Sequence, residues 1–394
     1  LDVARARESL EIEASDLDFE RMRAEAEATW EAALSQIEVQ GRYERDFRIF
    51  YTALYHALLM PTLMSEPGGA YHGLDGSEHT DDIDHYSDFS LWDTYRTFHP
   101  LIATLDPPQA SVFVRSLMAM AEQHGSYPRW PLGTGETGGM LGEPAAIVIA
   151  DAWARGARDY DLARAYELFA VSGRGNVDEY VSHGYVPIEG GGSSASKTLE
   201  FAYADHALMR MAEALGDTAG AVAYGERAES YRAIYDPARG FLVGRHADGA
   251  FMAELDETRW NDVYAEGNAW QYLWLVPHDL TGLAELSGGR DAFLERLDSF
   301  FMESARERRG LAPPVWYWHG NEPDLHAPFV FGALEDPDRT ARWSAWARSE
   351  HYDDTPTGLA GNDDGGALAS WYVMAPLGLY TLAGEPDWIV GSPL

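Results

Sequence analysis

The chain has 394 residues and not one cysteine. Disulfide bonds, thiolate metal sites and cysteine nucleophiles are therefore excluded. Basic side chains are also scarce, since 29 Lys and Arg stand against 64 Asp and Glu and give a formal net charge of −35. A field this negative repels phosphate backbones and anionic lipid surfaces, so the composition disfavours binding to nucleic acid or to a membrane.

Long apolar runs are missing as well. No stretch approaches the roughly 20 uninterrupted apolar residues that span a bilayer, and no basic segment followed by an apolar run marks a signal peptide at the start. We expect any signal peptide to have been removed or to lie outside this chain. We also expect the protein to be secreted, periplasmic or on the cell surface of a bacterium.

Helical periodicity is what the sequence has in abundance. From Phe47 the large residues recur at the i, i+3, i+4 and i+7 positions of one helix face, which Pro61 ends. A second helix is predicted from Lys197 to Leu215, because Gly216 suits a helix cap. Similar patterns predict further helices at 18–39, 93–105, 109–123, 144–156, 159–171, 217–236, 268–286, 290–303, 323–332, 337–349 and 365–379.

Strand-like alternation is rare by comparison. Only short pieces such as Gly240–Val243 and Ala250–Met252 fit a strand, and together they predict one hairpin. No repeat of about 34 or 40 residues is visible, which disfavours a helical solenoid. The pattern therefore predicts an all-α protein, either a helical bundle or a closed α/α toroid, with its long loops gathered at one end.

The predicted loops collect tryptophan, glycine, carboxylates and carboxamides. Aromatic faces stack on the C–H surfaces of sugars, while Asp, Asn and Gln bind hydroxyl groups. Each motif alone is also explained by a core Trp or an Asp or Asn that caps a helix, but their recurrence favours a carbohydrate cleft. The loops in question are 78–88, 127–143, 182–196, 264–271, 316–323 and 361–366.

Several familiar catalytic and binding motifs can be discarded. Gly133–Gly138 fits G-x-G-x-x-G, but no buried strand precedes it, as a dinucleotide site requires. A P-loop, an H-E-x-x-H zinc motif and a G-x-S-x-G elbow are all missing from the sequence. The acidic residues between Asp81 and Asp88 lack EF-hand spacing and are interpreted as a solvated loop.

Paired carboxylates are the chemistry that remains. Cleavage of a glycosidic bond needs one carboxylic acid to protonate the leaving oxygen and a second carboxylate to attack or to activate water. The candidates are Glu266, Glu322, Asp363 and Asp364, each close to Gly or Asn. Aromatic neighbours would raise the pKa of Glu266, as a general acid requires. One of the two aspartates is expected to cap the helix that follows.

A metal ligand set is a further possibility at the Pro-fixed turn. Asn321 and Glu322 offer hard oxygen atoms there, and oxygen ligands suit calcium and not zinc.

Conspicuous motifs follow one another along the chain: Leu91–Arg96 (LWDTYR), Ser196–Tyr203 (SKTLEFAY), Glu266–Tyr272 (EGNAWQY) with Val276–Asp279 (VPHD), His319–Pro323 (HGNEP), and Gly361–Asp364 (GNDD) with Ser370–Val373 (SWYV). In these motifs and their order the chain resembles the calcium-dependent, exo-acting α-mannosidases of glycoside hydrolase family 92. The resemblance runs from about residue 40 to the final Gly391–Pro393.

The resemblance implies an (α/α)6 toroid as catalytic domain, which we place at residues 41–394. Residues 1–40 are expected to be a linker helix region that leads from an N-terminal β-sandwich of the same full-length protein. Neither that sandwich nor the family's C-terminal strands lie in this sequence, so we expect an excised domain or a fragment.

The resemblance also implies hydrolysis of terminal α-linked mannose with inversion and with Ca²⁺ bound to the O2 and O3 hydroxyls of mannose. It assigns roles to nine residues: Glu266 as general acid, Asp364 as base with Asp363 as the alternative, Trp92 and Asp93 at the terminal sugar, Trp318 and His319 at the leaving sugar, and Asn321 and Glu322 at calcium.

Linkage specificity stays open among α-1,2, α-1,3, α-1,4, α-1,6 and phosphodiester bonds. The stretch 316–319 lacks the His-Glu pair of α-1,2-selective members, and the presence of Glu266 disfavours phosphodiesters. The alternatives are a non-catalytic carbohydrate-binding α/α domain, another inverting (α/α)6 enzyme such as a glucosidase, or a polysaccharide lyase. A lyase would favour a basic cleft, which the net charge of −35 opposes.

Overall fold

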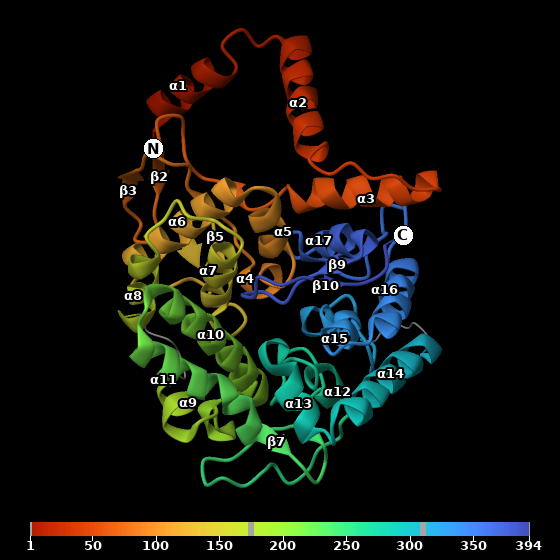
Figure 1. Ribbon diagram of the computed structural model, residues 1–394. Helices are drawn as coiled ribbons and strands as arrows, with labels where there is room; N and C mark the ends of the chain where they lie inside the picture. The colour runs from red at the N-terminus through yellow and green to blue at the C-terminus, as the bar shows by residue number, and fades with distance from the viewer. Residues whose placement is uncertain (1, 172–176, 308–312, 394) are drawn as a thin grey trace.

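The computed structural model describes residues 2–171, 177–307 and 313–393 (Figure 1). About 54% of it is helical, and the helices are α1 (Val3–Glu13), α2 (Phe19–Leu34), α3 (Glu44–Ala57), α4 (Leu91–Thr94), α5 (Phe98–Leu105), α6 (Pro107–His124), α7 (Pro144–Ala154), α8 (Leu162–Val171), α9 (Val177–His183), α10 (Ser194–Leu215), α11 (Thr218–Ala228), α12 (Ala269–Tyr272), α13 (Leu280–Leu286), α14 (Arg290–Arg306), α15 (Ala327–Ala333), α16 (Pro337–His351) and α17 (Ala367–Met374). Within the described ranges no helix is both long and apolar enough to cross a bilayer.

The strands are short and form antiparallel pairs, namely β1 (Thr62–Leu63) with β4 (Tyr86–Ser87), β2 (Ala70–His72) with β3 (Glu78–Thr80), β5 (Pro131–Leu132) with β6 (Gly135–Glu136), β7 (Tyr235–Asp236) with β8 (Phe241–Leu242), and β9 (Leu379–Tyr380) with β10 (Ile389–Val390). The hairpin predicted from 240–243 and 250–252 has a different pairing in the structure. The segment 241–242 pairs with 235–236, whereas 250–252 turns back onto 244–246 through a bridge between Phe251 and Arg245 and backbone hydrogen bonds on either side of it.

The longer helices form a closed ring of antiparallel pairs around a common centre (Figure 1). The last pair joins α17, close to the C-terminus, to α3, close to the N-terminus, and α17 also packs against α5. This arrangement confirms the predicted all-α (α/α)6 toroid. In chain order the pairs are α5–α6, α10–α11, α13–α14, α15–α16 and α17–α3, while α7 and α8 each pack against α6 and α10.

Burial distinguishes the inner helices from the outer ones. All eight residues of α17 and nine of the eleven residues of α7 are buried, whereas only five of the seventeen residues of α14 are. A helix that is apolar on every side needs neighbours on every side. The apolar composition of α7 and α17 therefore places them on the inside of the ring, where their ends support the loops of the mouth.

Two predicted helices are interrupted in the structure. The predicted helix 93–105 is divided into α4 and α5, and Thr97 lies between them with a non-helical φ of −146°. The predicted helix 268–286 is divided into α12 and α13, because Pro277 follows Val276 and cannot continue the hydrogen-bond ladder. Both breaks occur beside motifs with predicted functional residues, so local periodicity alone did not reveal them.

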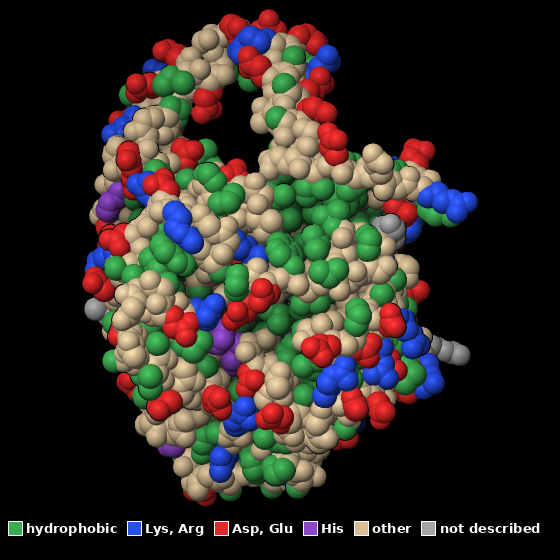
Figure 2. Space-filling model, in the orientation of Figure 1, with side chains coloured by type: hydrophobic (Ala, Val, Ile, Leu, Met, Phe, Trp, Pro, Cys, Tyr) green, Lys and Arg blue, Asp and Glu red, His purple; other side chains and the backbone are tan. Residues whose placement is uncertain are grey.

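Helices α1 and α2 stand apart from the ring as an arch with open space beneath it (Figures 1 and 2). Neither helix has a buried residue. The arch contacts the ring through an ion pair between Arg5 and Glu78, a hydrogen bond from the hydroxyl of Ser9 to the carboxylate of Glu66, and the ring of Trp30, which packs on Tyr55. Just after α2, Ile37 and Val39 pack against the core.

We expect removal of residues 1–28 to leave the free energy of unfolding unchanged to within about 1 kcal/mol, since an exposed ion pair and one partly exposed hydrogen bond contribute little. Removal of residues 1–40 should cost more, because it strips Trp30, Ile37 and Val39 from the ring. Urea unfolding of the two truncated chains and the full chain measures the difference. A large loss in the shorter truncation would show that the arch is part of the cooperative unit.

Candidate active site

Two glycine turns meet at the mouth of the ring. A Cβ atom on Gly320 would lie 2.6 Å from the carbonyl oxygen of Ala360, and one on Gly361 would lie 2.6 Å from the carbonyl oxygen of Gly320. Only residues without a Cβ permit this approach. The contact brings the turn that carries Asn321 and Glu322 against the loop that leads to Asp363 and Asp364.

A third loop, which carries Glu266, is held at the same place. The side-chain nitrogen of Asn321 donates to the backbone oxygen of Glu266 over 2.9 Å. Asn268 and Gln271 form a capping box at the start of α12, and the amide nitrogen of Gln271 donates to the backbone oxygens of Pro314 and Trp316. Glu266 itself has a left-handed backbone, with a φ of +49°, and its side chain is exposed to solvent.

Closure of the ring adds a fourth segment. A Cβ atom on Gly365 would lie 3.0 Å from the side chain of Thr94 and 3.2 Å from that of Ser90. The hydroxyl of Thr97 donates to the backbone oxygen of Ala367 over 2.7 Å. The start of α17 and the segment around α4 therefore lie side by side, and Asp93 on α4 faces the same centre as the aspartates that precede α17.

Four carboxyl groups from these segments act on one another electrostatically. Burial raises the pKa of Asp93 and of Glu322 well above its usual value, since each residue is only 2% exposed. The charge of Asp364 raises both pKa values further, and that of Asp93 adds to the effect on Glu322. Burial and then the charge of Asp364 also raise the pKa of Glu266. Carboxyl groups whose pKa values are raised by burial and by neighbouring charges are typical of catalytic sites.

The two adjacent aspartates differ in their contacts. A side-chain oxygen of Asp363 accepts the backbone N–H of Ala369 over 2.8 Å, which is the bond of a helix-capping residue. Asp364 has a left-handed backbone with a φ of +49°, and its carboxylate lies next to that of Glu322. Burial raises the pKa of Asp364, and the interaction with Glu322 lowers it. Of the pair, Asp364 is thus the one whose carboxylate faces the other acidic groups.

Trp92 belongs to a buried network below this cluster. Its indole is 1% exposed and donates to one oxygen of Glu200 over 3.0 Å. Arg96 donates to the same oxygen over 2.8 Å, and the hydroxyl of Tyr95 donates to the other over 3.2 Å. The charge of Arg96 lowers the pKa of Asp93 and of Glu322, though by less than burial raises it.

Sequence reasoning did not assign a role to Glu200 or Arg96. Both lie inside motifs that carried the resemblance, and both are charged residues among apolar neighbours. A charged residue at a position that helical periodicity places in the core is the signal that could have identified them, because buried charges occur in pairs.

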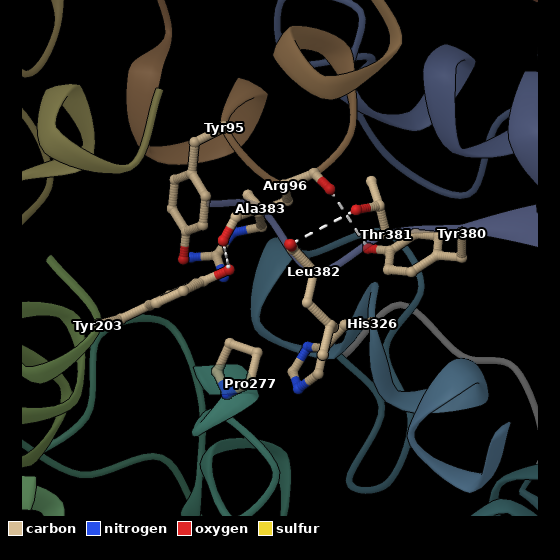
Figure 3. A pocket seen from close by; sticks show the side chains of 9 residues that line it. All are labelled: Tyr95, Arg96, Tyr203, Pro277, His326, Tyr380, Thr381, Leu382 and Ala383. Carbon is tan, nitrogen blue, oxygen red and sulfur yellow. Dashed lines mark hydrogen bonds between the residues drawn. The ribbon is translucent and has the colours of Figure 1, made fainter. Parts of the chain in front are cut away.

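Arg96 also lines a small cavity of about 20 Å³ (Figure 3). The hydroxyl of Tyr380 donates to the backbone oxygen of Arg96, and that of Tyr203 donates to the backbone oxygen of Ala383. This volume suits about one water molecule. A sugar ring does not fit into a space of this size.

His319 and Trp318 occupy different environments. The imidazole of His319 is fully buried, and its two nitrogens share hydrogen bonds with the hydroxyls of Tyr317 and Tyr352. A direct contact between His319 and a sugar would require this network to open. Trp318 is half-buried, and its ring packs against that of Trp260.

Comparison with known proteins gives a consistent result. Residues 5–394 match the model of the glycosyl hydrolase family 92 catalytic domain. A family 92 α-mannosidase from Bacteroides thetaiotaomicron in complex with mannoimidazole is 30% identical, with a TM-score of 0.94 over all of this chain and 54% of that one. A family 92 inverting mannosidase from the same organism is also 30% identical, with a TM-score of 0.92 over all of this chain and 57% of that one.

A curated relative extends the similarity to a fungus. An uncharacterised secreted glycosidase of Arthroderma benhamiae is 24% identical over 428 aligned positions, which cover 97% of this chain and 50% of that protein. The chain thus spans about half the length of the relatives it matches. Because the family model covers nearly the whole sequence, the chain belongs to glycoside hydrolase family 92 and corresponds to the catalytic domain of that family.

Proposed function

We propose that the protein is an exo-acting α-mannosidase that removes terminal α-linked mannose from glycans with inversion at the anomeric carbon. The observation that carries the proposal is the convergence of Asp93, Glu266, Glu322 and Asp364 from separate segments at the mouth of the ring. The similarity to a mannosidase described as inverting, and to another that holds mannoimidazole, supports the same conclusion.

In this proposal Glu266 is the general acid. Its raised pKa keeps the carboxyl protonated to a higher pH than that of an ordinary glutamate, and its exposed side chain is accessible to the leaving group. The acid delivers its proton to the glycosidic oxygen as the bond from that oxygen to C1 breaks. The leaving group departs as an alcohol, and Glu266 is left as a carboxylate.

Asp364 is the proposed general base. A water molecule attacks C1 from the face opposite the leaving group, and Asp364 accepts the proton that the water loses. Glu322 lies next to the Asp364 carboxylate and influences its pKa, while Asp363 is engaged with the helix backbone. The product is mannose with an inverted anomeric centre, and a later proton exchange with solvent restores both carboxyl groups.

The oxygen atoms near the turn at 321–322 fit a calcium ion. Oε1 of Glu322 is buried without a hydrogen-bond partner among the described residues. Asn321 donates its amide nitrogen to Glu266, which leaves its amide oxygen as the atom that it can offer to a cation. In the part of the chain that the structure describes, no three Asp, Glu or His side chains form a metal cluster. We therefore propose Asn321 and Glu322 as ligands, completed by backbone oxygens and water.

When bound, Ca²⁺ supplies positive charge and coordination sites for two adjacent hydroxyls of the sugar. Asn321 would also orient Glu266, because its amide nitrogen donates to the backbone oxygen of the acid. The hydrogen bond from Asn321 to the backbone of Glu266 thus links the proposed calcium ligands to the proposed acid.

The proposal is tested by the release of 4-nitrophenol from 4-nitrophenyl α-mannoside before and after treatment with a chelator. We expect chelation to lower the rate at least about tenfold, because the like charges of the acidic cluster lose their counter-ion, and calcium to restore it better than zinc. The matching α-glucoside serves as control and should not be cleaved. Full activity after exhaustive chelation would contradict the calcium proposal, and cleavage of the glucoside alone would favour a glucosidase.

The structure also suggests how Trp92 and His319 act. Trp92 is buried and held by Glu200, so we propose that it supports the floor of the pocket for the terminal mannose from beneath, with Asp93 beside it. We propose that His319 positions its neighbours, since the hydroxyl of Tyr352 links it to the backbone oxygen of Leu368 on α17.

We further propose that residues 1–40 form a linker region to a β-sandwich domain and that residues 41–394 form the catalytic domain. The arch carries apolar side chains that are more than half exposed, such as Leu10, Leu17 and Phe19. Secretion is proposed from the similarity to a secreted glycosidase. Secretion is tested by detection of the protein in the culture medium or surface fraction of its source organism.

The linker proposal is tested by crosslinking from residue 19 in the full-length protein, which should reach the β-sandwich domain.

A further inference from the structure

Trp260 has an unusual environment for a tryptophan. Its side chain is 47% exposed, and among the described residues no other tryptophan appears with the strongly exposed large apolar side chains. Its ring packs against that of Trp318, with centroids 5.7 Å apart and a tilt of 33°. Exposed aromatic surface of this size is unfavourable in water, so a tryptophan of this kind is often part of a binding surface.

The pair borders the proposed catalytic groups. The indole nitrogen of Trp318 would lie 3.0 Å from a Cβ atom on Gly320, at the point where that glycine meets Ala360. Trp318 therefore borders both the turn at 319–322 and the loop that leads to Asp364. The loop of Trp260 is held beside the same turn, since the amide nitrogen of Asn268 donates to the backbone oxygens of Thr258 and Val315.

The two tryptophans lie outside the pocket that would hold the terminal sugar. Asp93 and Glu322, at the floor of the site, are each only 2% exposed, whereas Glu266 and Trp260 are both open to solvent. Trp260 also precedes Glu266 by only six residues on one loop. In an inverting hydrolase the acid lies on the side of the leaving group. An exposed aromatic pair beside the acid thus faces the part of the substrate that departs.

Other tryptophans nearby have a different role. The ring of Trp316 packs against Trp270, and both contact Phe300, which is fully buried. Those side chains are explained by packing of the core. The contact between Trp260 and Trp318 lacks such support from buried rings in the described contacts, and it leaves an extended apolar face toward solvent.

We propose that Trp260 joins Trp318, which the family resemblance already places at the leaving sugar, to form an aromatic platform on which the leaving group of the substrate stacks, as a sugar or an aryl ring. This inference rests on the proposed α-mannosidase activity and identifies the substrate class that the site prefers. Mannosides whose leaving group presents a flat apolar face are bound through it, and mannosides with a minimal leaving group are not.

The test compares three substrates: an α-linked mannobiose, 4-nitrophenyl α-mannoside and α-mannosyl fluoride, whose leaving group cannot stack. We expect Trp260→Ala to lower kcat/KM about three- to tenfold on the first two, mainly through KM, because one aromatic stacking contact is lost. Activity on the fluoride should stay within about twofold of wild type. Trp260→Phe should restore most of the loss, since it keeps a stacking face.

Tyr43→Ala is the matched control, because Tyr43 is an aromatic residue that is 59% exposed at the start of α3. It should change none of the three rates. Equal loss on the fluoride and on mannobiose after Trp260→Ala, or no loss on either, would overturn the platform and leave the mannosidase proposal intact. Failure of the wild-type protein, with calcium present, to release mannose from any of the three substrates would instead contradict the proposed function, and the platform with it.

Discussion

Glu266→Gln is expected to lower kcat/KM on an α-linked mannobiose by about 10²- to 10⁴-fold, the usual contribution of a general acid. The amide keeps the shape of the side chain and the left-handed backbone of this position, but it has no proton to give. On α-mannosyl fluoride, whose leaving group departs with little help, the loss should be much smaller. Initial rates on the two substrates measure the contrast.

The pH dependence provides an internal control for the same variant. Because burial and the charge of Asp364 raise the pKa of Glu266, the acid stays protonated and active above the usual range of a glutamate. Activity is then lost as the pH rises through that pKa, and this alkaline limb of kcat/KM should disappear in Glu266→Gln. An equal loss on both substrates, with the limb retained, would mean that Glu266 is not the acid.

Asp364→Asn is expected to lower activity by about 10²- to 10⁴-fold on every substrate, whatever its leaving group. The water must lose a proton in each case, and the asparagine cannot accept it. Asparagine tolerates a positive φ, so the backbone at +49° should be retained. Azide needs no deprotonation, and its attack on C1 should yield a mannosyl azide from the activated substrates.

Asp363→Asn is the matched control for that substitution. It removes one negative charge from the neighbouring residue, and its amide oxygen still accepts the N–H of Ala369. We expect most of the activity to remain. If Asp363→Asn were the inactive variant and Asp364→Asn the active one, the two residues would have to exchange roles.

The helical architecture was predictable from sequence because it rests on local patterns. The periodic face that begins at Phe47 and the glycine cap at Gly216 each correspond to observed helix features. The breaks at Thr97 and Pro277 and the short strands were not predicted, since tertiary contacts decide them. Closure of the ring by α17 against α3 depends on residues more than 300 positions apart, which periodicity cannot report.

For the candidate site, sequence identified the residue types but not their surroundings. Glycines beside carboxylates indicated close backbone approach, and the contact between Gly320 and Gly361 is such an approach. The opposite environments of Asp363 and Asp364 could not be separated from their spacing, because both precede the same helix. Trp260 belonged to no motif, and its exposure beside Trp318 became visible only in three dimensions.

The anomeric form of the first product tests the central claim most directly. Proton NMR spectra recorded during hydrolysis of 4-nitrophenyl α-mannoside with calcium present distinguish α-mannose from β-mannose before mutarotation mixes them. Catalysis by Glu266 and Asp364 as an acid and base pair predicts that β-mannose forms first and that α-mannose follows only as the solution equilibrates. Initial formation of α-mannose, or no release of mannose at all, would contradict the account.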